Sequence, residues 1–485
     1  MKHLYIFSIL FLLVISCNRD DSTGIFKTVS EITITDVDTL NVNFGFELIR
    51  KANVSQTITD RPLEYEWATA FYTNEATTDT LKVISREEEL RYAFRQSGKF
   101  KLRLKVFNGD EAVFKEYIVF VNEPFEEGIM LFAKNESGEG NLSFLKKLTS
   151  EDIEAGEEEV MMEHCFATVN PDINMKNPVG ILHYTNTPQR LFVVLEDRIY
   201  FAEPKTLNLI ATVPFEGEFA NEKAKRIVDL SSMGMSPLIY TQDNQCIFVD
   251  PQSNFFFKNI AYGVYNEESN TMIYQPYYTG WWNVYTCFIN YSSSTIKSLS
   301  WSGGTLSTEE LFQNENILSA VYPNYNNSVF TISSPKENPE EMIIRTLGGY
   351  TLEELGNKFT YNLGANEKSI PQGTEFACCA LYQSAFWFEG SEIFAWNYSN
   401  PNPKLPQQSV IDVGANKEIT CMKLSTAETE IDKYLYVGVY DKSTQRGSLY
   451  IYDTSKVMND GRKLEPIKKF ENQTDRIIDI IYKNR

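Results

Sequence analysis

The side chains best suited to bind a ligand lie close together near the middle of the chain. They are Tyr277, Tyr278, Trp281, Trp282 and Asn283. Pro276 and Gly280 punctuate this run, and both residue types are typical of a loop. Rings on a loop can stack on a sugar or a peptide side chain, and the Asn283 amide can add a hydrogen bond. The alternative is that consecutive rings straddle two faces of a strand, with one buried and one half-exposed.

Histidine-dependent catalysis is poorly supported by the sequence. His164 stands beside Cys165, and neighbouring side chains on a strand point to opposite faces, so the pair makes a poor dyad or metal site. His183 lies in the apolar run 181–184, which favours a half-buried structural role. The sequence has no nucleophile elbow, zinc motif, calcium loop or phosphate-binding loop. We therefore predict no catalytic residue, no metal site and no cofactor.

Chemistry based on carboxylates remains the alternative. The chain has 65 aspartates and glutamates, and two acids about 5–10 Å apart are enough to cleave a glycosidic bond. The densest acidic run, residues 151–159, is more typical of a solvated loop. A hydrolase or lyase that acts on polysaccharide through such a pair is therefore kept as the second hypothesis.

The N-terminus reads as an export signal. Lys2 precedes an apolar run, residues 4–15, that is shorter than the roughly 20 residues a membrane-spanning helix needs. Residues 14–17 resemble a bacterial lipobox, which implies a signal peptide over 1–16 and lipidation (palmitate) of Cys17. Two or more acyl chains at Cys17 would hold the protein stably on a membrane.

Residues 17–27 are expected to be the lipid anchor and a polar tether. Residues 18–22 resemble the acidic export tag of surface lipoproteins in Bacteroides-type bacteria. That resemblance implies the cell-surface side of the outer membrane, and the periplasmic face is the less favoured location.

The composition favours an acidic, strand-rich protein of more than one domain. Aromatic residues make up 13% of 485 residues, and the formal net charge is −20. Such a charge repels nucleic acid, so no nucleic-acid partner is expected. Besides Cys17 we expect mostly buried free thiols, with disulfides as the alternative. These cysteines are Cys165, Cys246, Cys287, Cys378, Cys379 and Cys421.

Residues 28–123 predict a β-sandwich. The alternating runs 100–107 and 112–121 flank Asn108-Gly109, a strong signal for a hairpin. Tyr65-Glu66-Trp67 resembles the central strand of PKD-type domains, and residues 97–106 resemble a later strand of that family. The segment after Trp67 lacks the family's acidic, glycine-containing loop. The resemblance implies a divergent PKD/Ig-like domain, similar to PKD-like lipoproteins that accompany nutrient-import loci of Bacteroides relatives.

Residues 124–485 predict a β-propeller, most simply with seven blades. Paired strands joined by tight polar turns recur at a spacing typical of propeller blades, about 40–50 residues. The clearest copies are 191–201, 238–250, 386–397 and 434–453. The first run, 128–133, and the final run, 476–482, could share one closing blade. A pair of β-sandwiches is the rival fold.

These observations together predict an all-β, non-catalytic surface lipoprotein. The expected role is capture of a nutrient, glycan or peptide, with a TonB-dependent importer of the SusC/SusD type as the partner. Besides the polysaccharide-cleaving enzyme, a structural adhesin is the third hypothesis.

Overall fold

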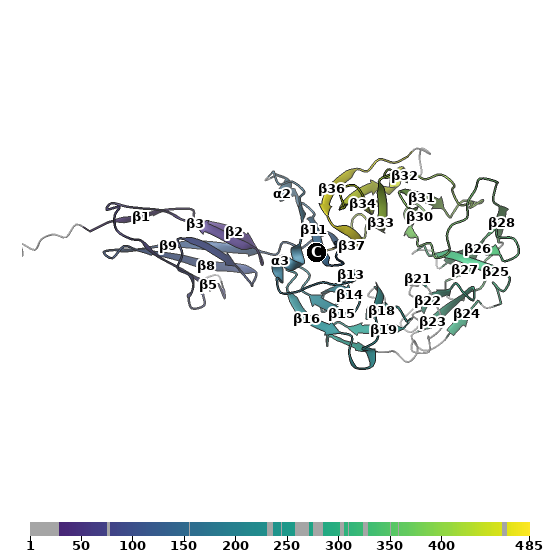
Figure 1. Ribbon diagram of the computed structural model, residues 1–485, viewed down its shortest axis with the longest axis horizontal. Helices are drawn as coiled ribbons and strands as arrows, with labels where there is room; N and C mark the ends of the chain where they lie inside the picture. The colour runs from purple at the N-terminus through teal and green to yellow at the C-terminus, as the bar shows by residue number, and fades with distance from the viewer. Residues whose placement is uncertain are drawn as a thin grey trace, which may run out of the picture. The chain divides into compact units, whose positions relative to one another are not determined.

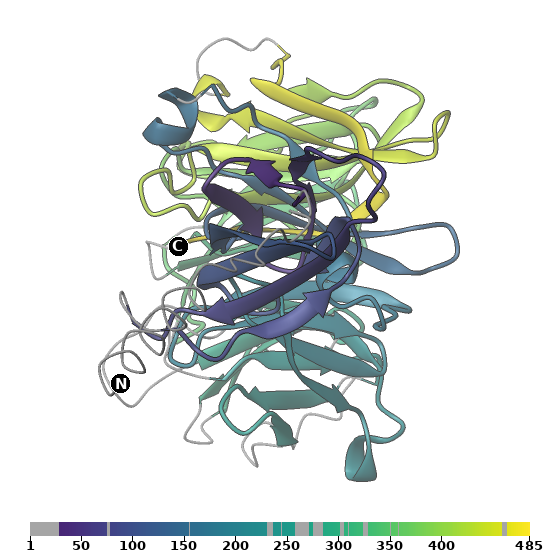
Figure 2. The ribbon, with the colours of Figure 1, turned by 90° about the vertical axis from the view of Figure 1, so that its left-hand side faces the viewer.

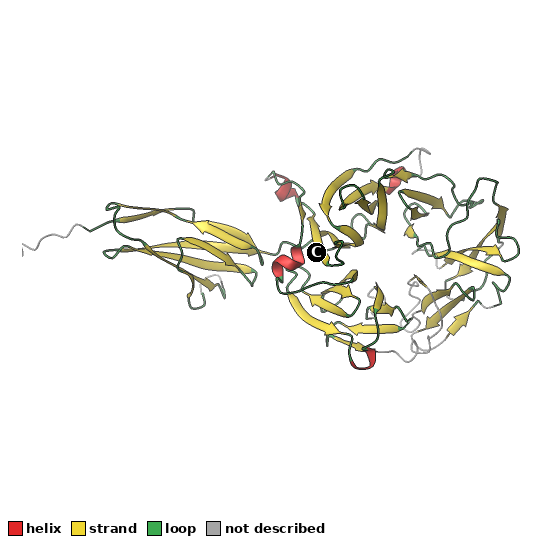
Figure 3. Ribbon diagram, viewed as in Figure 1, coloured by secondary structure: helices red, strands yellow, loops and turns green. Residues whose placement is uncertain are grey.

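The computed structural model describes most of the chain from residue 29 onward. The described residues are 29–74, 78–154, 156–229, 236–243, 245–257, 271–274, 285–300, 305–308, 310–323, 328–349, 351–356, 358–457 and 463–485. Cys17 and the aromatic segment 277–283 lie outside these ranges. The chain divides into two compact units, residues 1–122 and 123–485, and strands dominate both (Figure 3).

The first unit is built from one five-stranded sheet and two strand pairs. The sheet order is β2 (Thr39–Asn43), β9 (Ala112–Asn122), β8 (Gly98–Phe107), β5 (Glu64–Phe71) and β6 (Lys82–Ser85). The pairs are β1 (Ile32–Thr35) with β4 (Asn53–Gln56), and β3 (Glu47–Lys51) with β7 (Glu89–Ala93). Its long strands lie side by side in purple in Figure 2.

The predicted hairpin of the first unit is present. β8 and β9 pair antiparallel around the Asn108 turn, where the Asn108 side-chain oxygen accepts from the backbone of Asp110 and Glu111. Trp67 on β5 is fully buried and stacks on Tyr117 of β9, with ring centroids 5.9 Å apart. β5 continues to Phe71, so the segment after Trp67 that departs from the PKD pattern is strand and not loop.

The described residues of the second unit form seven four-stranded antiparallel sheets, which follow one another around a ring (Figure 1). The closing sheet consists, from the ring centre outward, of β37 (Arg476–Lys483), β10 (Gly128–Lys134), β11 (Gly140–Lys146) and β12 (Met161–Met162). The last sheet consists of β33 (Lys417–Leu424), β34 (Tyr434–Asp441), β35 (Arg446–Asp453) and β36 (Lys468–Thr474).

Five further sheets complete the ring. They are β13 (Pro178–Tyr184), β14 (Arg190–Leu195), β15 (Arg198–Ala202) and β16 (Leu209–Pro214); β17 (Ala224–Val228), β18 (Leu238–Thr241), β19 (Cys246–Asp250) and β20 (Phe255–Phe257); β21 (Thr271–Tyr274), β22 (Tyr285–Asn290), β23 (Thr295–Ser300) and β24 (Thr305–Ser307); β25 (Glu315–Val321), β26 (Ser328–Pro335), β27 (Glu341–Gly348) and β28 (Phe359–Asn362); and β29 (Ala377–Cys379), β30 (Ser384–Glu389), β31 (Glu392–Asn397) and β32 (Ile411–Asp412).

Short helices lie in the connections: α2 (Ser150–Glu154), α3 (Cys165–Val169), η1 (Gly217–Phe219) and η3 (Thr454–Lys456). Within the described residues, no helix has the length and apolar character needed to cross a membrane.

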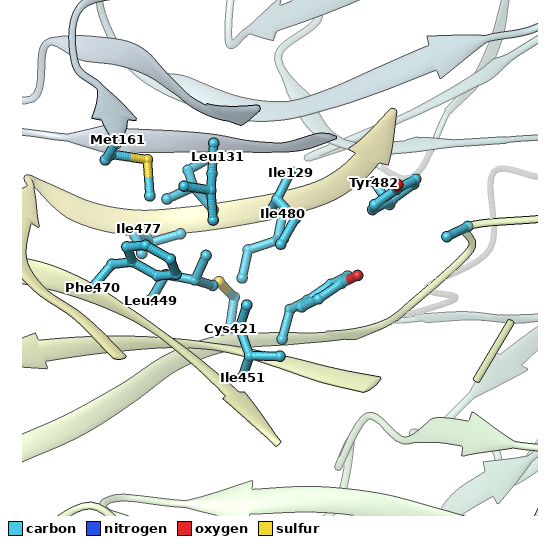
Figure 4. Packing of buried hydrophobic residues seen from close by; sticks show 13 residues of the cluster. Ile129, Leu131, Met161, Cys421, Leu449, Ile451, Phe470, Ile477, Ile480 and Tyr482 are labelled. Carbon is cyan, nitrogen blue, oxygen red and sulfur yellow. The ribbon is translucent and has the colours of Figure 1, made fainter. Parts of the chain in front are cut away.

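The ring closes by pairing the two ends of the second unit. β37 runs antiparallel to β10 along its whole length, so the chain's final strand is the inner strand of the sheet that also holds the unit's first strand. The prediction that runs 128–133 and 476–482 share a sheet is confirmed. Ile477 and Ile480 of β37 pack with Ile129 and Leu131 of β10 against Cys421 of the last sheet (Figure 4).

The cysteines of the described core are free thiols. Cys165, Cys246, Cys378, Cys379 and Cys421 form no disulfide. On β29, Cys379 packs in the core shared with the last sheet, and Cys378 packs in the core shared with β25–β28. The two thiols therefore face opposite ways, as predicted for a strand, and burial raises the pKa of Cys378 to about 12. Cys378 and Cys379 are core residues and not a redox pair.

Candidate ligand-binding site

Two predicted site features cannot be placed on the fold. Tyr277, Tyr278, Trp281, Trp282 and Asn283 fall outside the described residues, in the sequence between β21 and β22. Cys17 also falls outside them. The proposed roles of these residues remain predictions from sequence.

The two histidines of the second unit lie on separate elements. His164 precedes α3 in a left-handed backbone conformation (φ 54°). The expectation that His164 and Cys165 lie on a strand was therefore wrong, because a helix begins there. His183 on β13 is buried, more fully than predicted, and its Nε2 has no hydrogen-bond partner. Burial, and then the positive charge of Lys483, lower the pKa of His183 to about 4.

Two carboxylates of the second unit, those of Asp479 and Glu375, are held by cationic partners. Asp479 of β37 accepts from the backbone N of Ile181 at 3.0 Å and lies 3.8 Å from the Lys423 ammonium. Glu375, just before β29, receives a 2.8 Å hydrogen bond from Arg226 of β17. Among the described residues no cluster of three or more His, Cys, Asp or Glu side chains suits a metal ion. At Asp479 and Glu375 the carboxylates therefore have a structural role, which is to pair with nearby positive charges.

A polar pocket of about 550 Å³ lies at the turns between the closing and last sheets. Its walls are residues 134–138 at the turn between β10 and β11, Tyr440, Thr444 and Gln445 at the turn between β34 and β35, and residues 475–476 at the start of β37. We call it the turn pocket. Hydroxyl, amide, carboxylate and guanidinium groups meet there around one phenol ring, that of Tyr440. Such groups suit a ligand rich in hydroxyls or amides.

Local hydrogen bonds fix both turns. The backbone N of Glu139 donates to the Asn135 side chain at 2.9 Å, and Gly138 adopts φ 76°, which glycine accepts freely. In the second turn the backbone N of Ser443 donates to Asp441 at 2.8 Å. A Cβ at Gly447 would overlap the Asp475 carbonyl oxygen, so the close approach of these strands requires glycine. The pocket walls are therefore rigid turns on sheet ends.

Charged side chains beside the turn pocket fix the position of Arg476. The Arg476 guanidinium pairs with Glu418 and lies 5.1 Å from the centroid of the Tyr440 ring. Lys442 contacts Glu418 at 3.0 Å. Partial burial acts to raise the pKa of Glu418, but hydrogen bonds from Lys442 and Arg476 bring it below its usual value. Arg476 is thus oriented before any ligand arrives, which reduces the entropy lost on binding.

Sequence reasoning missed the turn pocket. Its residues come from the two ends of the second unit, and Asn141 and Asp475, 334 positions apart, are joined by a 2.5 Å hydrogen bond beside it. The one signal that could have located the site was the predicted pairing of 128–133 with 476–482, since closure brings these turns together.

Comparisons with known proteins show the fold and leave the activity open. No protein-family model matches the chain, and no curated protein matches its sequence. Among solved structures the chain is similar to a quinoprotein alcohol dehydrogenase-like protein from Bacteroides thetaiotaomicron, at a TM-score of 0.52 and 15% identity over 93% of this chain and 97% of that one. At that identity the likeness concerns the fold alone.

Two weaker likenesses also occur. One is to a Synechocystis apocarotenoid oxygenase mutant, at a TM-score of 0.34 and 8% identity over 95% of this chain and 97% of that one. The other is to a Dos1 propeller, at a TM-score of 0.36 and 7% identity over 74% of this chain and 88% of that one. The class that the fold and site define is an all-β protein with a propeller whose sheet-end turns form a polar pocket.

Proposed function

We propose that this chain is a non-catalytic, lipid-anchored binding protein of the outer-membrane surface. It captures a glycan or peptide for a TonB-dependent importer of the SusC/SusD type. Cys17 carries the lipid, residues 28–123 form a PKD-type spacer, and residues 124–485 form a seven-bladed propeller that binds the ligand. The buried Trp67 stacked on Tyr117 supports the PKD-type assignment, and the seven four-stranded sheets support the blade number.

The observation that carries the proposal is the turn pocket. Its volume of about 550 Å³ suits a small oligosaccharide or a short peptide segment. The Tyr440 ring, with the Arg476 guanidinium over one face, offers its other face for stacking, and that guanidinium, already held by Glu418, offers donors in a fixed orientation. The aromatic run 277–283 is the second candidate contact surface, on sequence grounds.

The test is binding of the mature protein, from residue 18 onward, to arrays of glycans and peptides. We expect selective micromolar binding that weakens at least tenfold in Tyr440→Ala and Arg476→Gln. Arg198→Gln is the matched control. Arg198 lies on a sheet away from the turn pocket and, like Arg476, pairs with a carboxylate, that of its neighbour Asp197. A Trp281→Ala/Trp282→Ala variant tests the second surface in the same assay.

Partner capture tests the importer part separately. Affinity purification of the full-length lipoprotein from native membranes should recover a TonB-dependent transporter. Binding to no array component, together with recovery of no transporter, would refute the proposal.

A further inference from the structure

A second pocket, of about 290 Å³, lies between the closing and last sheets at the strand ends opposite the turn pocket. Gly128 and Ile129 begin β10 on one side, and Tyr434 and Tyr436 begin β34 on the other. Nothing in the proposed capture of a glycan or peptide uses this pocket. We call it the inter-sheet pocket.

The inner walls of the inter-sheet pocket are apolar and buried, whereas its remaining lining includes the charged side chains of Lys146, Lys147, Glu159, Glu430 and Lys468. Ile129, Leu145, Ile451, Tyr436 and Tyr482 all line it, and each belongs to the buried core. The rings of Tyr436 and Tyr482 are within 12° of parallel, with centroids 6.4 Å apart; Figure 4 shows Tyr482 at the edge of the core that Ile129 and Ile451 share. Protein cores leave few voids of this size, and an apolar cavity of about 150 Å³ in another protein binds benzene.

An acidic segment, residues 149–154 and 156–160, borders the pocket, and its carboxylates form ion pairs with lysines. Thr149 and Asp152 cap α2 reciprocally: the Thr149 backbone N donates to the Asp152 carboxylate at 2.9 Å, and the Asp152 backbone N donates to the Thr149 hydroxyl at 3.1 Å. This run was predicted as a solvated loop, and the structure corrects that expectation for its first turn, which is helical because of the cap.

Two lysines that line the pocket form ion pairs with the carboxylates of this segment. Lys146 lies 3.0 Å from Asp152 and 3.5 Å from Glu157, and Lys468 lies 2.6 Å from Glu159. These pairs are partly exposed to solvent, so each contributes little and is screened by salt. Ile153, on the same segment, lines the pocket while 63% of it stays exposed. The segment therefore covers part of the pocket, and weak ion pairs hold it there. We call it the cover.

We propose that the inter-sheet pocket binds a small ring compound that carries a carboxylate. The ring lies between the aliphatic side chains and the paired tyrosines. The ligand carboxylate pairs with Lys468 in place of Glu159, and the acidic cover is displaced. A neutral ring compound gains the apolar contacts only, so the pocket prefers the acid.

Isothermal titration calorimetry of the mature protein with 3-phenylpropionate and with 3-phenylpropanol tests this. We expect both to bind, the acid at least fivefold more tightly. Ile451→Trp fills the pocket and should weaken both at least tenfold, and Ile451→Phe is the milder variant should the first unfold. Ile210→Trp, at a half-exposed position on β16, is the control for an added indole.

The role of the rim is tested by Lys468→Gln, with Lys469→Gln as its neighbour on the same strand. Lys468→Gln should remove the preference for the acid and, because it also releases Glu159 of the cover, should strengthen or leave unchanged the binding of 3-phenylpropanol, whereas Lys469→Gln should change neither. Tyr440→Ala in the turn pocket should have no effect here, which separates this site from glycan or peptide capture. Absence of binding at millimolar ligand, equal affinity for acid and alcohol, or insensitivity to filling at Ile451 would each overturn the proposal.

Discussion

At the scale of single residues, the informative groups are ionisable side chains that the fold buries. Asp432, in the loop before β34, is one of them. Its carboxylate accepts from the backbone N of Ala380 at 2.8 Å, and its own carbonyl accepts from the Thr454 hydroxyl at 2.7 Å. Burial raises the pKa of Asp432, although hydrogen bonds from the backbone of Ala380 and Leu381 oppose this. Asp432 therefore joins the sheet of β29–β32 to the last sheet, and its charged form is poorly solvated there.

This raised pKa predicts how Asp432→Asn and Asp432→Ala behave. Because the folded state binds the proton more readily than the unfolded state, the stability that Asp432 gives is largest at low pH and declines as pH rises above about 4. Asp432→Asn keeps an acceptor for the Ala380 backbone N–H. Its free energy of unfolding should therefore increase relative to that of the wild type as the pH rises from 4 to 7. Asp432→Ala leaves that N–H unpaired and should lose about 1–3 kcal/mol at either pH. Urea unfolding at the two pH values measures both, and a wild-type advantage over Asp432→Asn that grows with pH would contradict the argument.

The lowered pKa of His183 gives the free energy of unfolding the opposite dependence on pH. Its pKa falls from 6.5 to about 4 on folding, so below pH 6.5 the unfolded state binds more protons and stability is lost as pH falls through that window. At about 1.4 kcal/mol per pH unit the whole effect is on the order of 3 kcal/mol. His183→Phe keeps a buried ring that does not titrate. The difference in unfolding free energy between wild type and His183→Phe should shift against the wild type from pH 7 to pH 4.5, and a constant difference would show that His183 is protonated equally in both states.

At the scale of elements, the closing strand β37 is the one whose loss matters most. Ile480 is buried against the last sheet, whereas its neighbour Ile481 points the other way and is half-buried. Ile480→Ala should cost about 2–5 kcal/mol, the range for an aliphatic side chain removed from a core. Ile481→Ala is the matched control in the same strand and should cost clearly less. Thermal and urea unfolding compare them, and equal losses would mean that β37 is not packed by alternate faces.

Much of this element-scale order was predictable from sequence. Hairpins such as β34–β35 and β30–β31 were located because apolar strands with short polar turns leave a local pattern. α2 was not predicted, because the hydrogen bonds between Thr149 and Asp152 that cap it lie in a run whose charge density suggested a loop. Both pockets were missed for a different reason: the residues of each come from the two ends of the second unit, and only ring closure brings the turn 135–138 beside Tyr440, or Ile129 beside Tyr436.

At the scale of the whole molecule, the two units are expected to fold independently. The pairing of β37 with β10 lies wholly within residues 123–485, and among the described strands no sheet of the propeller includes one from the first unit. A fragment of residues 123–485 should therefore unfold cooperatively, with a Tm within about 5 °C of the matching transition in the mature chain. Calorimetry of this fragment, of residues 28–122 and of the mature chain gives the comparison. A fragment without a cooperative transition would show that the division at residue 122 does not separate folding units.

The anchor is the remaining property of the whole molecule, and Cys17 is the residue on which it depends. If the segment 14–17 directs lipidation, the wild type should incorporate labelled palmitate and remain with membranes after a high-salt wash, since two or more buried acyl chains hold a protein far more firmly than surface charge does. Cys17→Ser removes the sulfur that the lipid requires, so label should be lost and the mature chain should leave the membrane fraction. Ser16→Ala, which keeps a small residue before the cysteine, should behave as the wild type. Palmitate incorporation by Cys17→Ser would place the lipid elsewhere, whereas retention in the membrane without any label would mean that protein contacts, and not acyl chains, hold the molecule there.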